Sequence, residues 1–194
     1  MNRMAVALCL ALVPAAAGAA DPDWPCIQAK VVTLSAGLMW PAPVTVAPLS
    51  SAAQDLVEVL ALRRVDLQAA EDHVHKFVAS EQNVDAQVLG NVFIGVFERL
   101  AGDRNRLMAG IARYAKSQTA LAARIDGEHS EMDQLLAVEA PHFDRVDKLE
   151  EQIDWDERIY HDRARSLTYV CETPVLLEKR AYAIAQMLLK SLPK

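Results

Sequence analysis

The chain has 194 residues, with 26 acidic and 20 basic side chains and a formal net charge of −6 at pH 7. An acidic chain without a cluster of Lys and Arg is not typical of proteins that bind nucleic acids or anionic membrane surfaces, so we expect neither partner. The sequence has no Gly-x-Ser-x-Gly elbow, phosphate-binding glycine loop or His-Glu-x-x-His helix. It therefore indicates neither an enzyme nor a cofactor.

The first 20 residues have the three parts of a secretory signal peptide. Arg3 gives a positive start, residues 5–13 form an apolar centre, and Ala17-Gly18-Ala19 provide small residues before Asp21. The apolar centre is too short to cross a bilayer, so we expect residues 1–20 to be removed and the rest not to insert into a membrane. The periplasm is the expected location, and full secretion is the alternative.

The number of cysteines in the mature chain depends on removal of the signal peptide. Cys9 leaves with the signal peptide, and Cys26 and Cys171 remain. Two cysteines in an oxidising compartment predict one disulfide, and the absence of a Cys-x-x-Cys motif makes it structural rather than catalytic. Free thiols or a bridge between chains are the alternatives. A lipid anchor on Cys9 is rejected, because this residue comes too early in the apolar run and follows the large Leu8.

Residues 21–49 are predicted to form an extended arm packed on the domain. Five of the nine prolines fall between Pro22 and Pro48, and proline removes a helical hydrogen bond. Trp24, Met39 and Trp40 are the candidate contacts in this arm. Tryptophans near a disulfide are more often anchors that hold the chain down, and the alternative is that they bind a partner.

Residues 50–194 are predicted to form an all-α domain, a helical bundle of about five helices. A first helix is expected over 51–79, with Ser50 or Ser51 as N-cap, because apolar residues recur at helical spacing. A second, over 84–101, is apolar nearly all round, which is typical of a central helix. Its Gly90 and Gly95 lower helix stability, and we expect them to allow the close approach of another backbone.

Two longer helices are expected to follow, over 103–138 and from Pro141 to about Cys171. Gly102-Asp103 is taken as a break before the first. Their apolar residues alternate steps of three and four, as in a coiled-coil seam, so we expect a long antiparallel hairpin that closes at 139–141 and projects in part beyond the bundle. Pro174 is expected to start a fifth helix, over 174–192.

Four polar residues occupy positions where these helical stripes call for apolar ones: Arg63, Gln118, Glu128 and Asp156. An unpaired buried charge is costly, so each should have a partner. With the predicted hairpin closure, Asp156 lies opposite Arg124 and should form an ion pair with it. Contacts that set the helix register are the favoured interpretation, and a ligand pocket is the alternative.

The five histidines, His73, His75, His129, His142 and His161, do not have the spacing of a helical metal site. The paired Glu-x-x-His pattern of di-iron bundles is also missing, so no metal is predicted. The favoured hypothesis is a non-enzymatic exported bundle that binds a protein partner, with homodimer formation left open. The alternative is a metal- or small-ligand-binding bundle, with its site near Arg63 or at histidines gathered only by folding.

Overall fold

The computed structural model describes residues 24–192, so the predicted signal peptide, residues 1–20, lies outside the described part of the chain. The elements are a short 3₁₀ turn, Ala36–Leu38, and four helices: α1 (Ser51–Ala61), α2 (Leu67–Ser80), α3 (Ala86–Leu136) and α4 (Phe143–Lys190). The predicted all-α class is confirmed. The described residues hold four α-helices rather than five, because two predicted breaks are absent and one break was missed.

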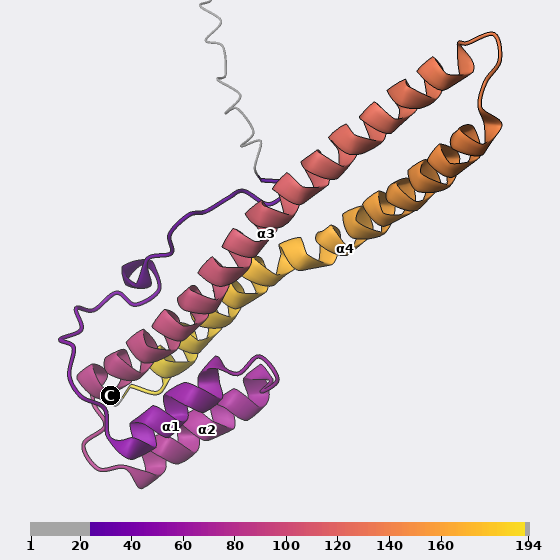
Figure 1. Ribbon diagram of the computed structural model, residues 1–194. Helices are drawn as coiled ribbons and strands as arrows, with labels where there is room; N and C mark the ends of the chain where they lie inside the picture. The colour runs from indigo at the N-terminus through magenta and orange to yellow at the C-terminus, as the bar shows by residue number, and fades with distance from the viewer. Residues whose placement is uncertain (1–23, 193–194) are drawn as a thin grey trace, which may run out of the picture.

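The two long helices form an antiparallel hairpin whose tip is residues 137–142. At 1.5 Å per residue, α3 is about 76 Å long and α4 about 72 Å. The helices α1 and α2 lie against only one half of this hairpin, the half that contains the start of α3 and the end of α4 (Figure 1). The other half projects beyond α1 and α2 as a pair of helices that ends at the tip.

The predicted break at Gly102-Asp103 is wrong, because α3 runs through both residues. Leu100 and Arg104 are both buried on its inner face, so packing on each side of the glycine holds the helix together. Asp103 does not cap a helix. It forms an ion pair with Arg106 one turn later.

The predicted break at Pro174 is also wrong, because the proline lies inside α4. A proline in a helix interior costs about 3 kcal/mol relative to alanine. Here Pro174 is itself buried, between Cys171 and Leu177, which are buried too. Packing of this turn against the rest of the bundle offsets the lost backbone hydrogen bond.

The missed break lies within the first predicted helix, which the structure divides into α1 and α2 around residues 62–66. Asp66 caps α2 by accepting a hydrogen bond from the backbone N–H of Ala69. Arg180 of α4 completes the turn, because its guanidinium donates to the carbonyl oxygens of Leu60 and Val65, at 2.9 and 2.7 Å. This arginine is distant in sequence, so local helical periodicity does not reveal the break.

The main core lies where all four helices and the arm meet. Phe93 of α3 is fully buried at its centre, between Trp40 of the arm and Phe97. The central position predicted for residues 84–101 is therefore correct for the start of α3, whose buried residues here include Leu89, Val92, Phe93 and Val96.

The glycines of this segment make room for side chains rather than for another backbone. A Cβ on Gly90 would lie 2.8 Å from Cγ2 of Val44 in the arm, and one on Gly95 would lie 3.1 Å from Cγ2 of Val57 in α1. Valine is stiff about χ1, so Val44 cannot move aside without moving the arm.

Two glycine-to-alanine changes in α3 are expected to have opposite effects on stability. Gly127→Ala should raise the free energy of unfolding by up to about 1 kcal/mol, because alanine is the better helix former and nothing lies within 4 Å of the added Cβ. Gly90→Ala should lower it, because its Cβ meets Val44. Urea unfolding of both variants measures the difference, and stabilisation by Gly90→Ala would show that the arm does not pack tightly there.

Candidate functional site

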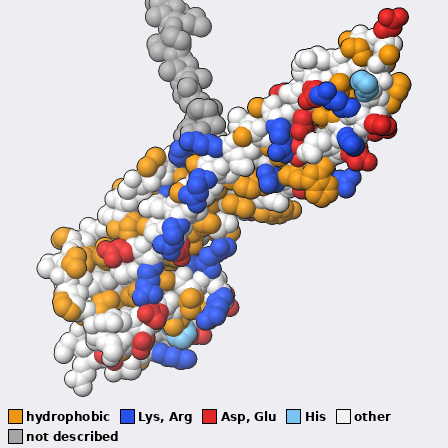
Figure 2. Space-filling view, in the orientation of Figure 1, with side chains coloured by type: hydrophobic (Ala, Val, Ile, Leu, Met, Phe, Trp, Pro, Cys, Tyr) orange, Lys and Arg blue, Asp and Glu red, His pale blue; other side chains and the backbone are white. Residues whose placement is uncertain are grey.

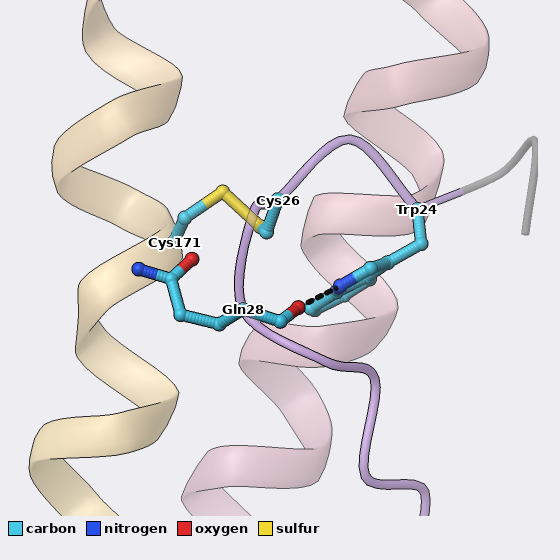
Figure 3. The surroundings of a disulfide bond; sticks show 4 residues. All are labelled: Trp24, Cys26, Gln28 and Cys171. Carbon is cyan, nitrogen blue, oxygen red and sulfur yellow. Dashed lines mark hydrogen bonds between the residues drawn. A yellow bond between two sulfur atoms is a disulfide. The ribbon is translucent and has the colours of Figure 1, made fainter. Parts of the chain in front are cut away.

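The arm is fastened to the hairpin by the predicted Cys26–Cys171 disulfide, whose Cα atoms are 5.6 Å apart. Figure 3 shows the arm turning around Cys26, with the Trp24 indole N–H donating to the carbonyl oxygen of Gln28 at 2.6 Å. Lys30 Nζ lies 5.9 Å from the Trp24 ring centroid. The half-buried Trp24 thus helps to shape the turn that carries Cys26.

Further along, the arm pairs with α3 through two side-chain amides one helical turn apart. Gln87 accepts from the backbone N–H of Thr45 at 2.9 Å and donates to the carbonyl of Pro43 at 3.1 Å. Asn91 accepts from the N–H of Ala47 and donates to the carbonyl of Thr45, both at 3.0 Å. Each side-chain amide accepts one hydrogen bond from the arm's backbone and donates another to it. The extended arm is therefore held in the same way as a β-strand is held by the peptide groups of a neighbouring strand.

Trp40 is buried in the core, with 3% of its surface exposed, and stacks on Phe93 at a centroid distance of 5.5 Å. The alternative in which Trp40 binds a partner is therefore wrong, because its ring is covered by the protein's own core. Met39 is half-buried and packs against the same core. The arm residues chosen from the sequence serve mainly as anchors.

Arg104 is a further anchor that the sequence did not single out. It is 1% exposed, and its guanidinium binds the carboxylate of Glu178 in α4 and the carbonyl oxygen of Val31 in the arm. One side chain therefore joins α3, α4 and the arm. The sequence signal was weak, because Arg104 follows the assumed break at Gly102-Asp103.

In the projecting half, the predicted polar seam residues connect α3 to α4. Gln118 donates to the carbonyl oxygen of Tyr160 at 3.1 Å, and the hydroxyl of Tyr114 donates to the carbonyl oxygen of Arg163, also at 3.1 Å. Arg124 and the buried Asp156 form the ion pair that the sequence predicted. These contacts fix the register of the two helices.

Glu128 lies beside this ion pair. Burial raises the pKa of Glu128, and the nearby Asp156 carboxylate raises it further. Burial alone would also raise the pKa of Asp156, but hydrogen bonds from Gln152 and Arg124 and the Arg124 charge bring it below its ordinary value. The two carboxyl groups therefore differ in proton affinity, and Glu128 is the one that retains its proton to higher pH.

Glu128→Gln is expected to stabilise the protein near pH 8 and to have little effect near pH 4. Because the pKa of Glu128 is raised in the folded state, its contribution to stability is lost as pH rises above 4.5, the ordinary value, through the folded pKa. A glutamine amide can donate to Asp156 at every pH, for a gain on the order of 1 kcal/mol at high pH. Urea unfolding at both pH values tests this, and an equal effect at both would contradict it.

Arg63 is not a buried polar residue. It is exposed in the turn between α1 and α2, because α1 ends at Ala61 and the helical stripe that placed Arg63 inside does not continue. It lies instead at the edge of a groove between α3 and α4.

That groove, which we call the waist groove, lies where the hairpin leaves the bundle. It has a volume of about 380 Å³ and is lined by apolar side chains and by charged ones of both signs, including Arg63, Asp103, Arg106, Leu107, Ile111 and Val170. A second hollow of about 140 Å³ continues it towards the tip, past Tyr114 and Leu167. The groove thus extends along the hairpin from the place where α1 and α2 end.

Along its outer side, α4 exposes large apolar side chains that we call the α4 flank: Trp155, Tyr169, Val170 and Leu176. Of these, Val170 also lines the waist groove. Trp155 and Tyr169 are 58% and 76% exposed. Figure 2 shows hydrophobic side chains gathered along the lower edge of α4 in the projecting half, with basic side chains next to them. Trp155, Tyr169 and Leu176 are spaced by multiples of seven, which puts them on one side of the helix.

The sequence did contain a signal for this flank. Its seven-residue spacing is visible in the sequence, but the same helix carries a second apolar stripe that faces α3, and the spacing alone does not show which stripe is exposed. The histidines add no such signal: His129 pairs with Glu157 at 3.0 Å. Among residues 24–192, no three His, Cys, Asp or Glu side chains form a group that could hold a metal ion.

Comparisons with protein-family models, with curated proteins and with solved structures found no match for the chain. Within residues 24–192, no helix is both long enough and apolar enough to cross a membrane.

Proposed function

We propose that the protein is exported and acts without catalysis, by binding a protein partner through the α4 flank. The observation that carries this proposal is the exposure of Trp155 and Tyr169 on a part of the hairpin that α1 and α2 leave uncovered. Aromatic side chains of this kind contribute most of the binding energy in many protein interfaces.

The fold supplies the rigidity that such a surface needs. In the projecting half, buried Ile125 and Ile153 and the Arg124–Asp156 pair hold α3 and α4 together. The flank therefore stands on a helix whose inner side is already packed, and binding a partner requires little ordering of the chain.

The binding test is a quantitative pull-down from the periplasm of the source cells with the mature protein as bait. We expect a second protein to be recovered in stoichiometric amount, and its recovery to fall at least tenfold with the bait Trp155→Ala/Tyr169→Ala. Tyr182→Ala is the matched control, because Tyr182 is an aromatic on α4 outside the flank that is 53% exposed, close to the 58% of Trp155. Equal recovery with all three baits would contradict the proposed surface.

Export is tested separately by expressing the full chain in a Gram-negative host and determining the first residue of the purified protein. Cleavage after Ala20, giving a chain that begins at Asp21, is the expected result. A chain that keeps residues 1–20 would contradict export by this signal.

A further inference from the structure

We infer that the partner of the α4 flank is a second copy of this chain, in an antiparallel dimer with its two-fold axis at Trp155. This inference rests on the proposed binding surface. It starts from the half of the hairpin that α1 and α2 do not cover (Figure 1). A second hairpin has the length and the helical form to cover it.

A two-fold axis requires that residues at equal distances on either side of one point be complementary. On α4, the residues seven positions from Trp155 are Lys148 and Asp162. Both lie on the same side of the helix as Trp155, because seven residues are almost two full turns. With Trp155 facing Trp155 of the second copy, Lys148 of each chain would face Asp162 of the other.

The residues 14 positions from Trp155 on either side would also face each other in this dimer. Tyr169 lies 14 residues from Trp155 in one direction, about 21 Å along the helix. Pro141, 14 residues away in the other direction, belongs to the tip, just before α4 begins at Phe143. The dimer would therefore place each tip at the other chain's waist groove. The tip carries Val138, which is exposed, and the acidic Glu139. The groove offers Val170 and Arg63, together with Arg106, which already pairs with Asp103 in the same lining.

Two arginines also come near each other in this arrangement, Arg145 and Arg165, at ten residues from Trp155. Each already has an acidic partner in its own chain, Glu131 for Arg145 and Asp162 for Arg165. Their charges are thus partly compensated before the chains meet, and Asp162 would be shared between Arg165 of its own chain and Lys148 of the other. The self-complementarity around Trp155 favours a second copy over an unrelated protein, whose surface would have no reason to match this symmetry.

The first test is the mass of the mature chain at about 100 μM, by light scattering after size-exclusion chromatography. We expect twice the monomer mass for the unmodified protein and for Tyr182→Glu, and the monomer mass for Trp155→Glu. A monomeric unmodified protein, or a dimer that Trp155→Glu leaves intact, would overturn the inference. Helix content by circular dichroism verifies that each variant is folded.

The register is tested by exchanging charges. Lys148→Glu and Asp162→Lys should each weaken the dimer at least tenfold, and the double variant should restore it. In addition, Trp155→Cys should form a disulfide between chains under oxidising conditions, whereas Leu176→Cys, far from the axis, should not. Weakening by both single changes without restoration would overturn the proposed register.

These outcomes separate the dimer from the more general binding proposal. A monomer that still captures another protein through Trp155 and Tyr169 would leave the proposed function standing and remove only the dimer. A dimer that captures no other protein would leave the inference standing and show that the flank binds a second copy rather than a different protein.

Discussion

Replacing both Cys26 and Cys171 by serine is expected to lower the free energy of unfolding by about 4 to 5 kcal/mol. The bond joins residues 145 positions apart, so it removes a large part of the freedom of the unfolded chain. For a domain of this size, the loss corresponds to a fall in the melting temperature of roughly 10 to 20 °C. Thermal and urea unfolding of the double variant measure the effect.

Reduction of the unmodified protein is the matched control, because it breaks the same bond without changing the sequence. Both should destabilise the protein to a similar extent. The arm retains its other attachments, through Arg104 and through Gln87 and Asn91, so the folded state should persist at low temperature. A loss below about 1 kcal/mol would show that the bond constrains the unfolded chain far less than its loop length predicts.

Trp40→Ala is expected to lower the free energy of unfolding by about 3 to 5 kcal/mol, the usual range for removing a large buried aromatic side chain. Trp40 stacks on Phe93 and closes the core on the side of the arm. Its loss leaves a cavity against Phe93 and frees the middle of the arm. Urea unfolding followed by circular dichroism gives the change directly.

Leu38→Ala is the control, since Leu38 is only two residues away and is 87% exposed. Its effect should stay within about 0.5 kcal/mol, as for most surface changes. If Trp40→Ala is as mild as Leu38→Ala, the arm does not unfold together with the helical core, and its role as an anchored part of the bundle would be rejected.

The hairpin was predictable because its information is local and periodic. Steps of three and four define the seam, and closure near residues 139–141 then placed Asp156 opposite Arg124, where the structure has the ion pair. The disulfide was predictable from counting cysteines once Cys9 was assigned to the signal peptide.

The helix boundaries were less predictable, because tertiary contacts outweigh local propensity. Packing keeps α3 continuous at Gly102 and α4 continuous at Pro174. Conversely, the turn after α1 depends on Arg180, over a hundred residues away. Glycine and proline lower the local stability of a helix, but packing in the core can still keep the helix continuous.

The partner-binding candidates predicted from the sequence lie in the arm, and the surface that we propose lies on α4 instead. The arm tryptophans were expected mainly as anchors, with partner binding as the alternative, and the structure buries Trp40 there while leaving Trp155 exposed on α4. Burial of the arm depends on partners such as Phe93, Gly90 and Asn91, which no local pattern connects with it. The spacing of the α4 flank is present in the sequence, but its exposure follows only from which side of α4 packs on α3.

The half of the hairpin beyond α1 and α2 also has a mechanical consequence. From Leu107 to the end of α3 it extends about 44 Å, so a rotation of about 10° at the waist groove would move the tip by roughly 8 Å. The disulfide and the α1–α2 turn both lie close to the base of this projection. Small changes in packing at that level would therefore be amplified into large displacements at residues 137–142.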